Sequence, residues 1–299
     1  MKRMLLEQSS EEFYTSHSGL VLAGACVNRY SDLRRHVGRI AKGSDHIAEI
    51  DILRSYLGLL CLGKNDYQAI AAMREDDYFK QALGIGRMPS VERLRQRLDE
   101  AGTALIPVIN RSSRTMLKRL KAPITGYRSG LIPLDVDVFP QDNSNTKKEG
   151  VSRTYKNYDG YAPMAAYLGK EGWCLEVELR PGSQHSQKGF VDFIKRVISG
   201  ARELTTQPLL VRADAGNDAQ ESLVILEDAE KAHYIVKWNP RGSDVLSWRD
   251  RVFAEGVVKT PREGKRVGTM VIEEHKKVDG KPYIFKRIVR VIERTIDRN

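Results

Sequence analysis

Apolar residues recur at three- and four-residue spacing through residues 1 to about 125, which predicts a region of helices. One apolar helix face is predicted within DHIAEIDILRSYLGLLCLG, and Gly63 is expected to end that helix. The face consists of Ile47, Ile50, Leu53, Tyr56, Leu57 and Leu60. The segment RMPSVERLRQRLDEAG predicts another helix, with Ser90 as its N-cap and Gly102 just beyond its end. Short helices joined by such turns fit a DNA-reading helix-turn-helix, and they also fit a helical bundle that only supports the next segment.

From about residue 126 the pattern changes to short apolar runs bounded by turns, which predict strands. Three strands come first, the last two joined by a compact turn, and then a helix, a strand, a helix and a strand follow. The predicted strands cover residues 131–139, 161–169, 173–180, 208–214 and 232–238, and the predicted helices are SQKGFVDFIKRVISGARELT and about Asp218 to Lys231. This order predicts an α/β fold with a mixed sheet.

Beyond Pro240 the sequence becomes more charged and predicts antiparallel β-structure. Turns are expected at Arg262 to Lys265 and at Asp279 to Lys281. No internal repeat or low-complexity segment interrupts the chain.

The composition excludes several classes of protein. With 41% hydrophobic and 29% charged residues, the 299-residue chain has enough apolar side chains for real cores, so a wholly disordered chain is excluded. No apolar run approaches the roughly 18 to 20 residues of a membrane span, and the N-terminus does not resemble a secretion signal. Cys26, Cys61 and Cys174 are too widely separated for a disulfide framework or a cysteine zinc site, so we expect a reducing cytoplasm.

The charge balance favours a polyanionic partner. The chain contains 49 Lys and Arg against 39 Asp and Glu, a formal net charge of +10, which strengthens binding to nucleic acid at low salt. Basic side chains mix with tyrosines in NTKKEGVSRTYKNYDGY, at residues 145–161. From their density we expect Lys147, Lys148, Arg153 and Lys156 to contact a DNA backbone, although a solvated basic loop would have the same composition.

Acidic residues lie within one predicted strand and at the end of another. Asp135 and Asp137 are two residues apart in LDVDVF, so both point to the same face of the first strand. Asp214 ends the fourth strand in VRADAG, where ligands gather in open α/β sheets. Oxygen ligands of this kind suit Mg²⁺ or Mn²⁺. Asp214 could equally be a turn former or helix cap, and Asp218 is expected to cap the next helix.

Other chemistry finds little support in the sequence. His185 lies in the polar turn PGSQHS, where a ligand, a base and a simple hydrogen-bonded loop residue are all compatible with the sequence. The motifs GxGxxG, GxxxxGK[ST], GxSxG and HExxH do not occur, which disfavours the corresponding dinucleotide, nucleoside-triphosphate, serine-hydrolase and zinc-protease sites.

Three segments in order resemble the DDE transposases of bacterial insertion sequences, in the branch with an RNase H-like catalytic core. They are LDVDVFPQDNSNTKKEGVSRTYKNYDGYAPMAAYLG, LEVELRPGSQHSQKG and LLVRADAGND. The resemblance implies Asp137 as the first catalytic aspartate, with Asp135 as the alternative, and Asp214 as the second. It also implies Mg²⁺ or Mn²⁺ as the cofactor. The implied reaction is DNA strand cleavage and strand transfer, with the terminal inverted repeats of the element and target DNA as partners. A homodimer or larger assembly on DNA, in the cytoplasm and associated with the nucleoid, is expected as well.

The resemblance also sets expectations for the domain organisation. Residues 1–125 would form a helical, candidate DNA-binding domain, residues 126–240 the RNase H-like core, and residues 241–299 a β-rich insertion. The family's third acidic residue is a glutamate on a helix beyond that insertion, and Glu293 lies in a strand-like run instead. We therefore expect a fragment that stops before this glutamate. A stand-alone RNase H-like nuclease and a non-catalytic DNA-binding remnant that inhibits the full enzyme are the alternatives.

Overall fold

The computed structural model describes residues 10, 14–38 and 47–295. The chain divides into two compact units, each described here by itself. The N-terminal unit comprises Met1–Gln184 and Phe193–Gln207, and the C-terminal unit comprises His185–Asp192 and Pro208–Asn299.

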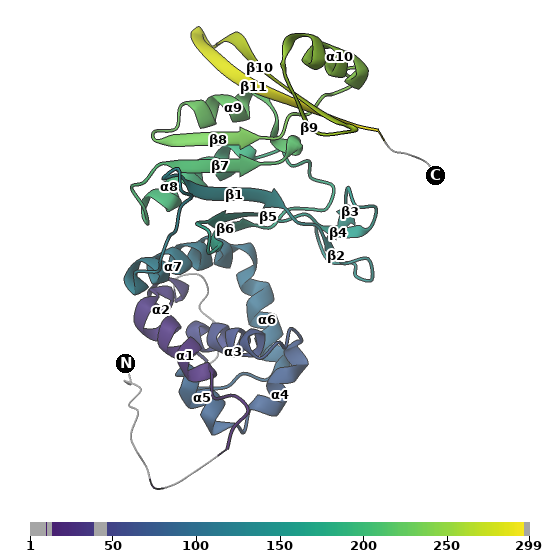
Figure 1. The fold of residues 1–299 in the computed structure, drawn as a ribbon. Helices are drawn as coiled ribbons and strands as arrows, with labels where there is room; N and C mark the ends of the chain where they lie inside the picture. Colours follow the sequence, from purple (N-terminus) through teal and green to yellow (C-terminus); the bar gives the residue numbers. More distant parts are fainter. Residues whose placement is uncertain (1–9, 11–13, 39–46, 296–299) are drawn as a thin grey trace. The chain divides into compact units, whose positions relative to one another are not determined.

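The first part of the N-terminal unit is helical, as the apolar spacing predicts (Figure 1). Its α-helices are α1 (Leu20–Ala25), α2 (Leu33–Val37), α3 (Glu49–Cys61), α4 (Ile70–Met73), α5 (Asp77–Leu83), α6 (Val91–Ala101) and α7 (Leu105–Leu120). A π-helical turn η1 (Cys26–Tyr30) extends α1, and the short 3-10 turns are η2 (Tyr67–Ala69) and η3 (Gly102–Ala104). The predicted cap of α6 is confirmed, because the Ser90 hydroxyl accepts a hydrogen bond from the backbone N–H of Arg93 at 3.2 Å.

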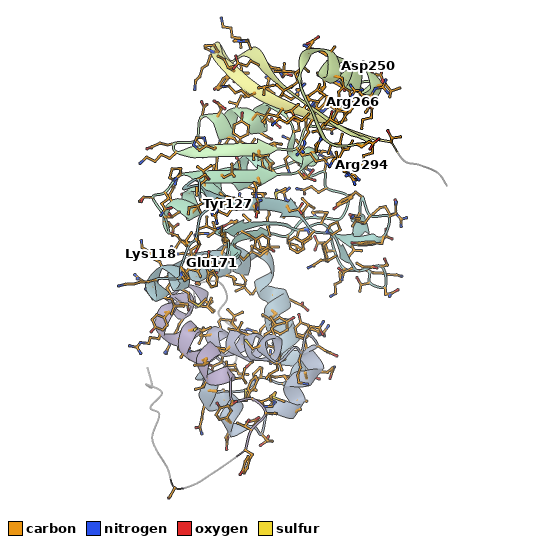
Figure 2. All side chains as sticks on the ribbon, viewed as in Figure 1. Lys118, Tyr127, Glu171, Asp250, Arg266 and Arg294 are labelled. Atoms are coloured by element: carbon orange, nitrogen blue, oxygen red, sulfur yellow. The ribbon has the colours of Figure 1, made fainter. Side chains whose placement is uncertain are left out.

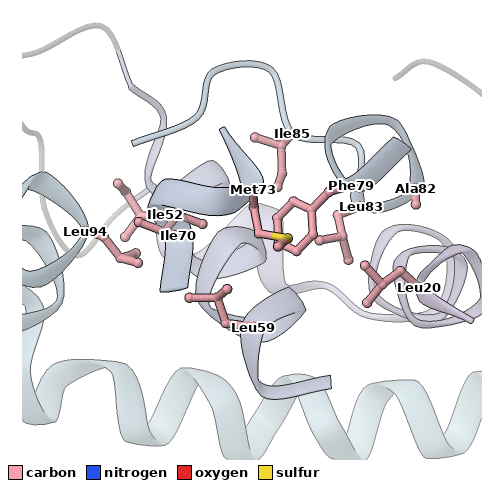
Figure 3. Close-up of a cluster of buried hydrophobic side chains, with 10 residues drawn as sticks. All are labelled: Leu20, Ile52, Leu59, Ile70, Met73, Phe79, Ala82, Leu83, Ile85 and Leu94. Atoms are coloured by element: carbon pink, nitrogen blue, oxygen red, sulfur yellow. The ribbon is translucent and has the colours of Figure 1, made fainter. Parts of the chain in front are cut away.

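A cluster of ten buried apolar side chains holds these helices together (Figure 3). Its members are Leu20, Ile52, Leu59, Ile70, Met73, Phe79, Ala82, Leu83, Ile85 and Leu94. The predicted face of α3 is partly wrong, since Leu60 is 47% exposed while Ile52 and Leu59 are almost fully buried. Gly58 explains the shift: a Cβ there would lie 2.6 Å from the Phe79 ring, so only glycine lets α5 pack this closely.

The second part of the N-terminal unit contains three antiparallel strands in the order β6–β5–β1. These are β1 (Ile132–Val138), β5 (Met164–Leu168) and β6 (Trp173–Glu178), which confirm the three predicted strands and the compact turn between the last two. Helix α7 lies along β6, where the Asn110 amide donates to the carbonyl of Val177 at 3.0 Å and accepts from its N–H at 3.2 Å. Asn110 thus satisfies backbone groups that an edge strand would otherwise leave open.

Helix α8 (Phe190–Arg202) buries a row of apolar side chains at helical spacing. Phe190, Phe193, Ile194, Val197 and Ala201 have no exposed surface, which explains why the sequence signals this helix clearly. In the turn before β6, Glu171 accepts a hydrogen bond from the N–H of Thr125 at 2.9 Å and so ties the turn to the segment before β1 (Figure 2).

A small sheet that the sequence does not reveal lies between β1 and β5 along the chain. It consists of β2 (Gln141–Asp142), β3 (Ser152–Arg153) and β4 (Asp159–Tyr161), in the order β2–β4–β3. Strands of two or three residues are too short to show an alternating pattern. Gly160 permits the pairing, because a Cβ there would lie 1.9 Å from the carbonyl oxygen of Gln141.

The C-terminal unit begins with a parallel pair of strands. They are β7 (Leu209–Ala213) and β8 (Ala232–Val236), joined through the 3-10 turn η4 (Ala215–Asn217) and helix α9 (Gln220–Glu227). A three-stranded antiparallel sheet follows, formed by β9 (Val257–Arg262), β10 (Lys265–Val278) and β11 (Lys281–Arg294). Both predicted turns of this segment are confirmed.

Helix α10 (Val245–Glu255) is an element that the sequence analysis missed. Asp244 caps it by accepting hydrogen bonds from the N–H groups of Leu246 and Ser247, at 2.9 and 3.1 Å. The helix lacks the apolar stripe that would have predicted it, because Leu246 is exposed and Val252 is its one buried residue. Val252 packs against Met270 and Val289 of the adjacent sheet.

Taken together, the units give an α/β protein with parallel and antiparallel strand pairs and a further β-rich segment. Among the described residues, no helix is long and apolar enough to cross a membrane.

Candidate functional site

The acidic face of β1 is separated from the core by simple alternation. Leu134 and Val136 point into the core, so Asp135 and Asp137 point to the opposite face, where Asp137 is exposed and Asp135 half-buried. The N–H of Val138 donates to Asp137 Oδ1 at 2.8 Å, which restrains that carboxylate. The structure therefore confirms that both acids share one face of the first strand.

Tyr167 of β5 joins this face, and the sequence analysis missed it. It lies directly opposite Asp135 in the antiparallel register, so its side chain is on the same face as both acids. Burial raises the pKa of Tyr167, and the neighbouring Cys174 and Asp137 raise it further. The alternation in YAPMAAYLG was the available signal, because Tyr167 is the exposed residue between buried Ala166 and Leu168.

Asp214 lies in the C-terminal unit, immediately after β7. Its Oδ1 accepts two hydrogen bonds at 3.0 Å, from the N–H of Gly216 and from the side-chain amide of Asn217. Asp214 therefore caps the turn η4, one of the two roles that the sequence allows. The carboxylate is exposed, and both hydrogen bonds use the same oxygen, Oδ1.

Gly216 keeps the turn beside Asp214 compact. A Cβ at this position would lie 2.2 Å from Ser186 Oγ and 3.2 Å from Asp214 Oδ1. Any larger residue would push against the serine and against the carboxylate itself, so the glycine of VRADAG supports the position of Asp214.

Two further sequence expectations concern Asp218 and His185. The predicted capping role of Asp218 is wrong: α9 has no side-chain cap, and Asp218 instead accepts from the N–H of Asn239 at 2.9 Å, holding the segment after β8. His185 is a hydrogen-bonded turn residue, since its Nδ1 accepts from the N–H of Gln187 at 3.1 Å.

The predicted DNA-contacting residues all lie on or beside the small sheet β2–β4–β3. Lys147, Lys148, Arg153 and Lys156 are exposed, and Arg153 lies 3.8 Å from the exposed carboxylate of Asp159. Tyr155 is 65% exposed, with Lys156 Nζ 5.3 Å from the centre of its ring. The side chain of Tyr158 anchors this sheet by donating to the carbonyl of Pro140 at 2.9 Å. We call residues 141–161 the basic hairpin.

Comparison with known proteins decides the family. The family described as Transposase DDE domain group 1 matches residues 9–265, most of the chain. The chain belongs to the DDE transposases. A solved structure, the piggyBac transposase synaptic complex with hairpin DNA, is similar at 9% sequence identity and a TM-score of 0.33. The similarity covers 93% of this chain and 60% of the other. No curated protein matches the chain significantly.

The DDE transposases use divalent metal ions. In the described part of the chain, no three His, Cys, Asp or Glu side chains form a metal-binding group. The acids of each unit nonetheless suit a hard cation, because Asp137 and Asp214 are exposed carboxylates that are each restrained by a backbone N–H. A DDE transposase would draw its ligands from such carboxylates.

Proposed function

We propose that the chain cleaves DNA strands at the ends of an insertion element and transfers them to target DNA. In this proposal Asp137 and Asp214 ligate Mg²⁺ or Mn²⁺, and Asp135 is the alternative to Asp137. The geometry of Asp214 supports this most directly, because one carboxylate oxygen is fixed by two donors while the residue remains exposed. A divalent ion held there would supply activation of the attacking oxygen and neutralisation of the leaving one.

The chain's own residues perform the other tasks. The N–H groups of Gly216 and Val138 orient the carboxylates of Asp214 and Asp137. Because these side chains are already restrained, less of their conformational entropy is lost when a ligand binds. The basic hairpin would hold backbone phosphates through its exposed lysines and arginine. Glu293 forms an ion pair with Arg266 at 3.3 Å, with Arg266 also 4.3 Å from the Phe253 ring, so we do not propose it as a third ligand (Figure 2).

We also propose that residues 126–240 form an RNase H-like catalytic core and that residues 241–299 are an insertion. The helical residues 1–125 would bind DNA at the element ends. Assembly as a homodimer or larger complex on that DNA belongs to the same proposal, and light scattering of the protein–DNA complex would measure it.

Metal binding tests the proposed ligands. We expect isothermal titration calorimetry of the full chain with Mn²⁺ to show a binding isotherm that Asp214→Asn and Asp137→Asn abolish. Asp99→Asn is the matched control, because Asp99 is an exposed carboxylate on α6 and its loss should leave the isotherm unchanged. If Asp135→Asn abolishes binding and Asp137→Asn does not, Asp135 is the first ligand. Equal binding by Asp214→Asn and the wild type would refute the metal site.

A further inference from the structure

A cavity of about 490 Å³ lies among the helices of the N-terminal unit, outside the acidic site and the basic hairpin. Its walls come from η1, α2, α3 and α7, which pack against one another in this unit (Figure 1). Four arginines line it, namely Arg34, Arg35, Arg54 and Arg119, and Asp32 is the one acid among the lining residues.

The acid of the cavity is already occupied by other partners. Asp32 accepts a hydrogen bond from the Ser112 hydroxyl at 2.9 Å and lies 3.2 Å from His36 Nε2 and 3.5 Å from Arg111 Nε. Burial alone would raise the pKa of Asp32, but the Ser112 hydrogen bond and the charges of His36 and Arg111 lower it overall. Asp32 is therefore ionised, and its carboxylate is engaged by Ser112, His36 and Arg111.

Arg54 brings a buried positive charge to the cavity wall. Its side chain is 8% exposed, and its Nη1 donates to the carbonyl of Gly84 at 2.7 Å while Nη2 donates to the Asn28 side chain. The nearest carboxylate, Asp51, lies 3.7 Å away and also accepts from the N–H of Arg87. Burial lowers the pKa of Arg54, the charge of Asp51 raises it, and the charge of Arg34 lowers it again, so Asp51 offsets only part of the cost of burying this guanidinium beside Arg34.

The remaining arginines are available to a ligand. Arg34 and Arg35 are exposed on α2 and form no hydrogen bond or ion pair with any residue that the structure describes. Arg119 uses Nη1 for the carbonyls of Tyr30 and Ser31, at 3.4 and 3.1 Å, which fixes the guanidinium at the rim. The cavity thus combines one buried, one anchored and two exposed guanidinium groups.

We propose that this cavity binds a phosphate group of the DNA backbone. Planar guanidinium groups match phosphate oxygens through paired hydrogen bonds, and several of them around one concavity suit a multiply coordinated anion. Lys118 (Figure 2) and Lys121 are exposed and lie within two residues of Arg119 along the chain, so further positive charge is available near this arginine, as a continuous polyanion requires and a small free anion does not. The inference rests on the proposed binding of DNA by residues 1–125 and names the side chains of that segment that would contact a phosphate.

A DNA-binding experiment tests this inference. Fluorescence anisotropy measures the binding of the full chain to a random-sequence DNA duplex in EDTA, over a range of salt concentrations. The test variant is Arg34→Ala with Arg35→Ala, which spares Arg54, whose removal would leave a buried cavity and unpaired acceptors. The matched control is Arg74→Ala with Arg95→Ala, two exposed arginines of the same unit that flank Glu92. Circular dichroism melting of all proteins confirms that they are folded.

We expect the slope of log K against log salt to decrease by about 0.9 for each phosphate that the test variant no longer neutralises, and to remain unchanged in the control. An unchanged slope in the test variant, or the same change in both variants, overturns the proposal. A second experiment measures the binding of inorganic pyrophosphate at constant ionic strength. If the test variant loses pyrophosphate binding but keeps the wild-type DNA slope, the cavity binds a free phosphate compound. The assignment to DNA would then be wrong.

The design separates this inference from the proposed metal site. EDTA removes divalent ions, so a failure of Asp137 and Asp214 to bind metal leaves the result unaffected. A protein that binds no DNA at any salt concentration would refute the proposed action on DNA and this inference together.

Discussion

At the residue scale, hydrogen bonds from the backbone explain how exposed acids can have defined positions. Asp214 Oδ1 is fixed by Gly216 and Asn217, and the missing Cβ of Gly216 leaves room for Ser186 beside it. On β1, the alternation of the strand separates the two acids from the buried Leu134. These features follow from short sequence motifs, so the identities of the acids could be predicted from sequence alone.

Tyr167 provides a local test of the acidic face. Because the negative charge of Asp137 contributes to its raised pKa, we expect Asp137→Asn to lower the pKa of Tyr167 towards its ordinary value near 10. The shift should be partial, since burial is the larger cause and remains in the variant. A pH titration of the tyrosine Cζ resonance by NMR, assigned with Tyr167→Phe, measures it.

Asp159→Asn is the control for that titration, because Asp159 lies in the basic hairpin and does not contribute to the raised pKa of Tyr167. An unchanged pKa of Tyr167 in Asp137→Asn would show that the Asp137 carboxylate does not face the tyrosine. The arrangement of the acidic face would then be wrong.

At the element scale, an element could be predicted where the chain has a helical period or a short apolar run bounded by turns. Helix α8 has buried residues at helical spacing, and β1, β5 and β6 lie in such apolar runs. Helix α10 has a single buried residue, and β2–β4–β3 has strands of two or three residues, so neither has a pattern to detect. The close approach of Gly58 to Phe79 and Leu83 is a tertiary contact that the apolar pattern of α3 does not show.

The basic hairpin makes a prediction at this scale. Exposed lysines on a small anchored sheet should bind DNA phosphates independently of base sequence. We expect Lys147→Ala with Lys148→Ala to reduce the salt slope of DNA binding by about 0.9 for each phosphate that these lysines neutralise in the wild type. Filter binding with several unrelated duplexes would show a uniform loss of affinity.

The matched control for the hairpin is Lys276→Ala with Lys277→Ala, since both lysines are exposed on β10 in the C-terminal unit. A wild-type slope in the hairpin variant would remove these lysines from the DNA interface. The basic hairpin would then be a solvated loop, the interpretation that the composition alone leaves open.

At the scale of the whole molecule, the net charge of +10 is distributed over separate surfaces. The basic hairpin and the arginine-lined cavity are positive, while Asp135 and Asp137 form a local acidic face. Three sequence segments in order resemble the DDE transposases, and the match over residues 9–265 confirms that family. The division into segments 1–125, 126–240 and 241–299 remains a prediction. The two compact units are defined by spatial contacts and are not continuous in sequence, because residues 185–192 belong to the C-terminal unit and residues 193–207 to the N-terminal unit.

The central claim is that Asp137 and Asp214 are catalytic, and strand cleavage tests it most directly. The measurement is the rate at which the full chain nicks DNA that carries the element's terminal inverted repeats, in Mn²⁺, for the wild type, Asp137→Asn, Asp214→Asn and the control Asp99→Asn. We predict that the wild type and the control nick this DNA at equal rates. The two ligand variants should lose more than about 100-fold, because disturbing outer-shell partners alone costs about 10- to 100-fold. Wild-type rates in both ligand variants, with DNA binding intact, would contradict the account.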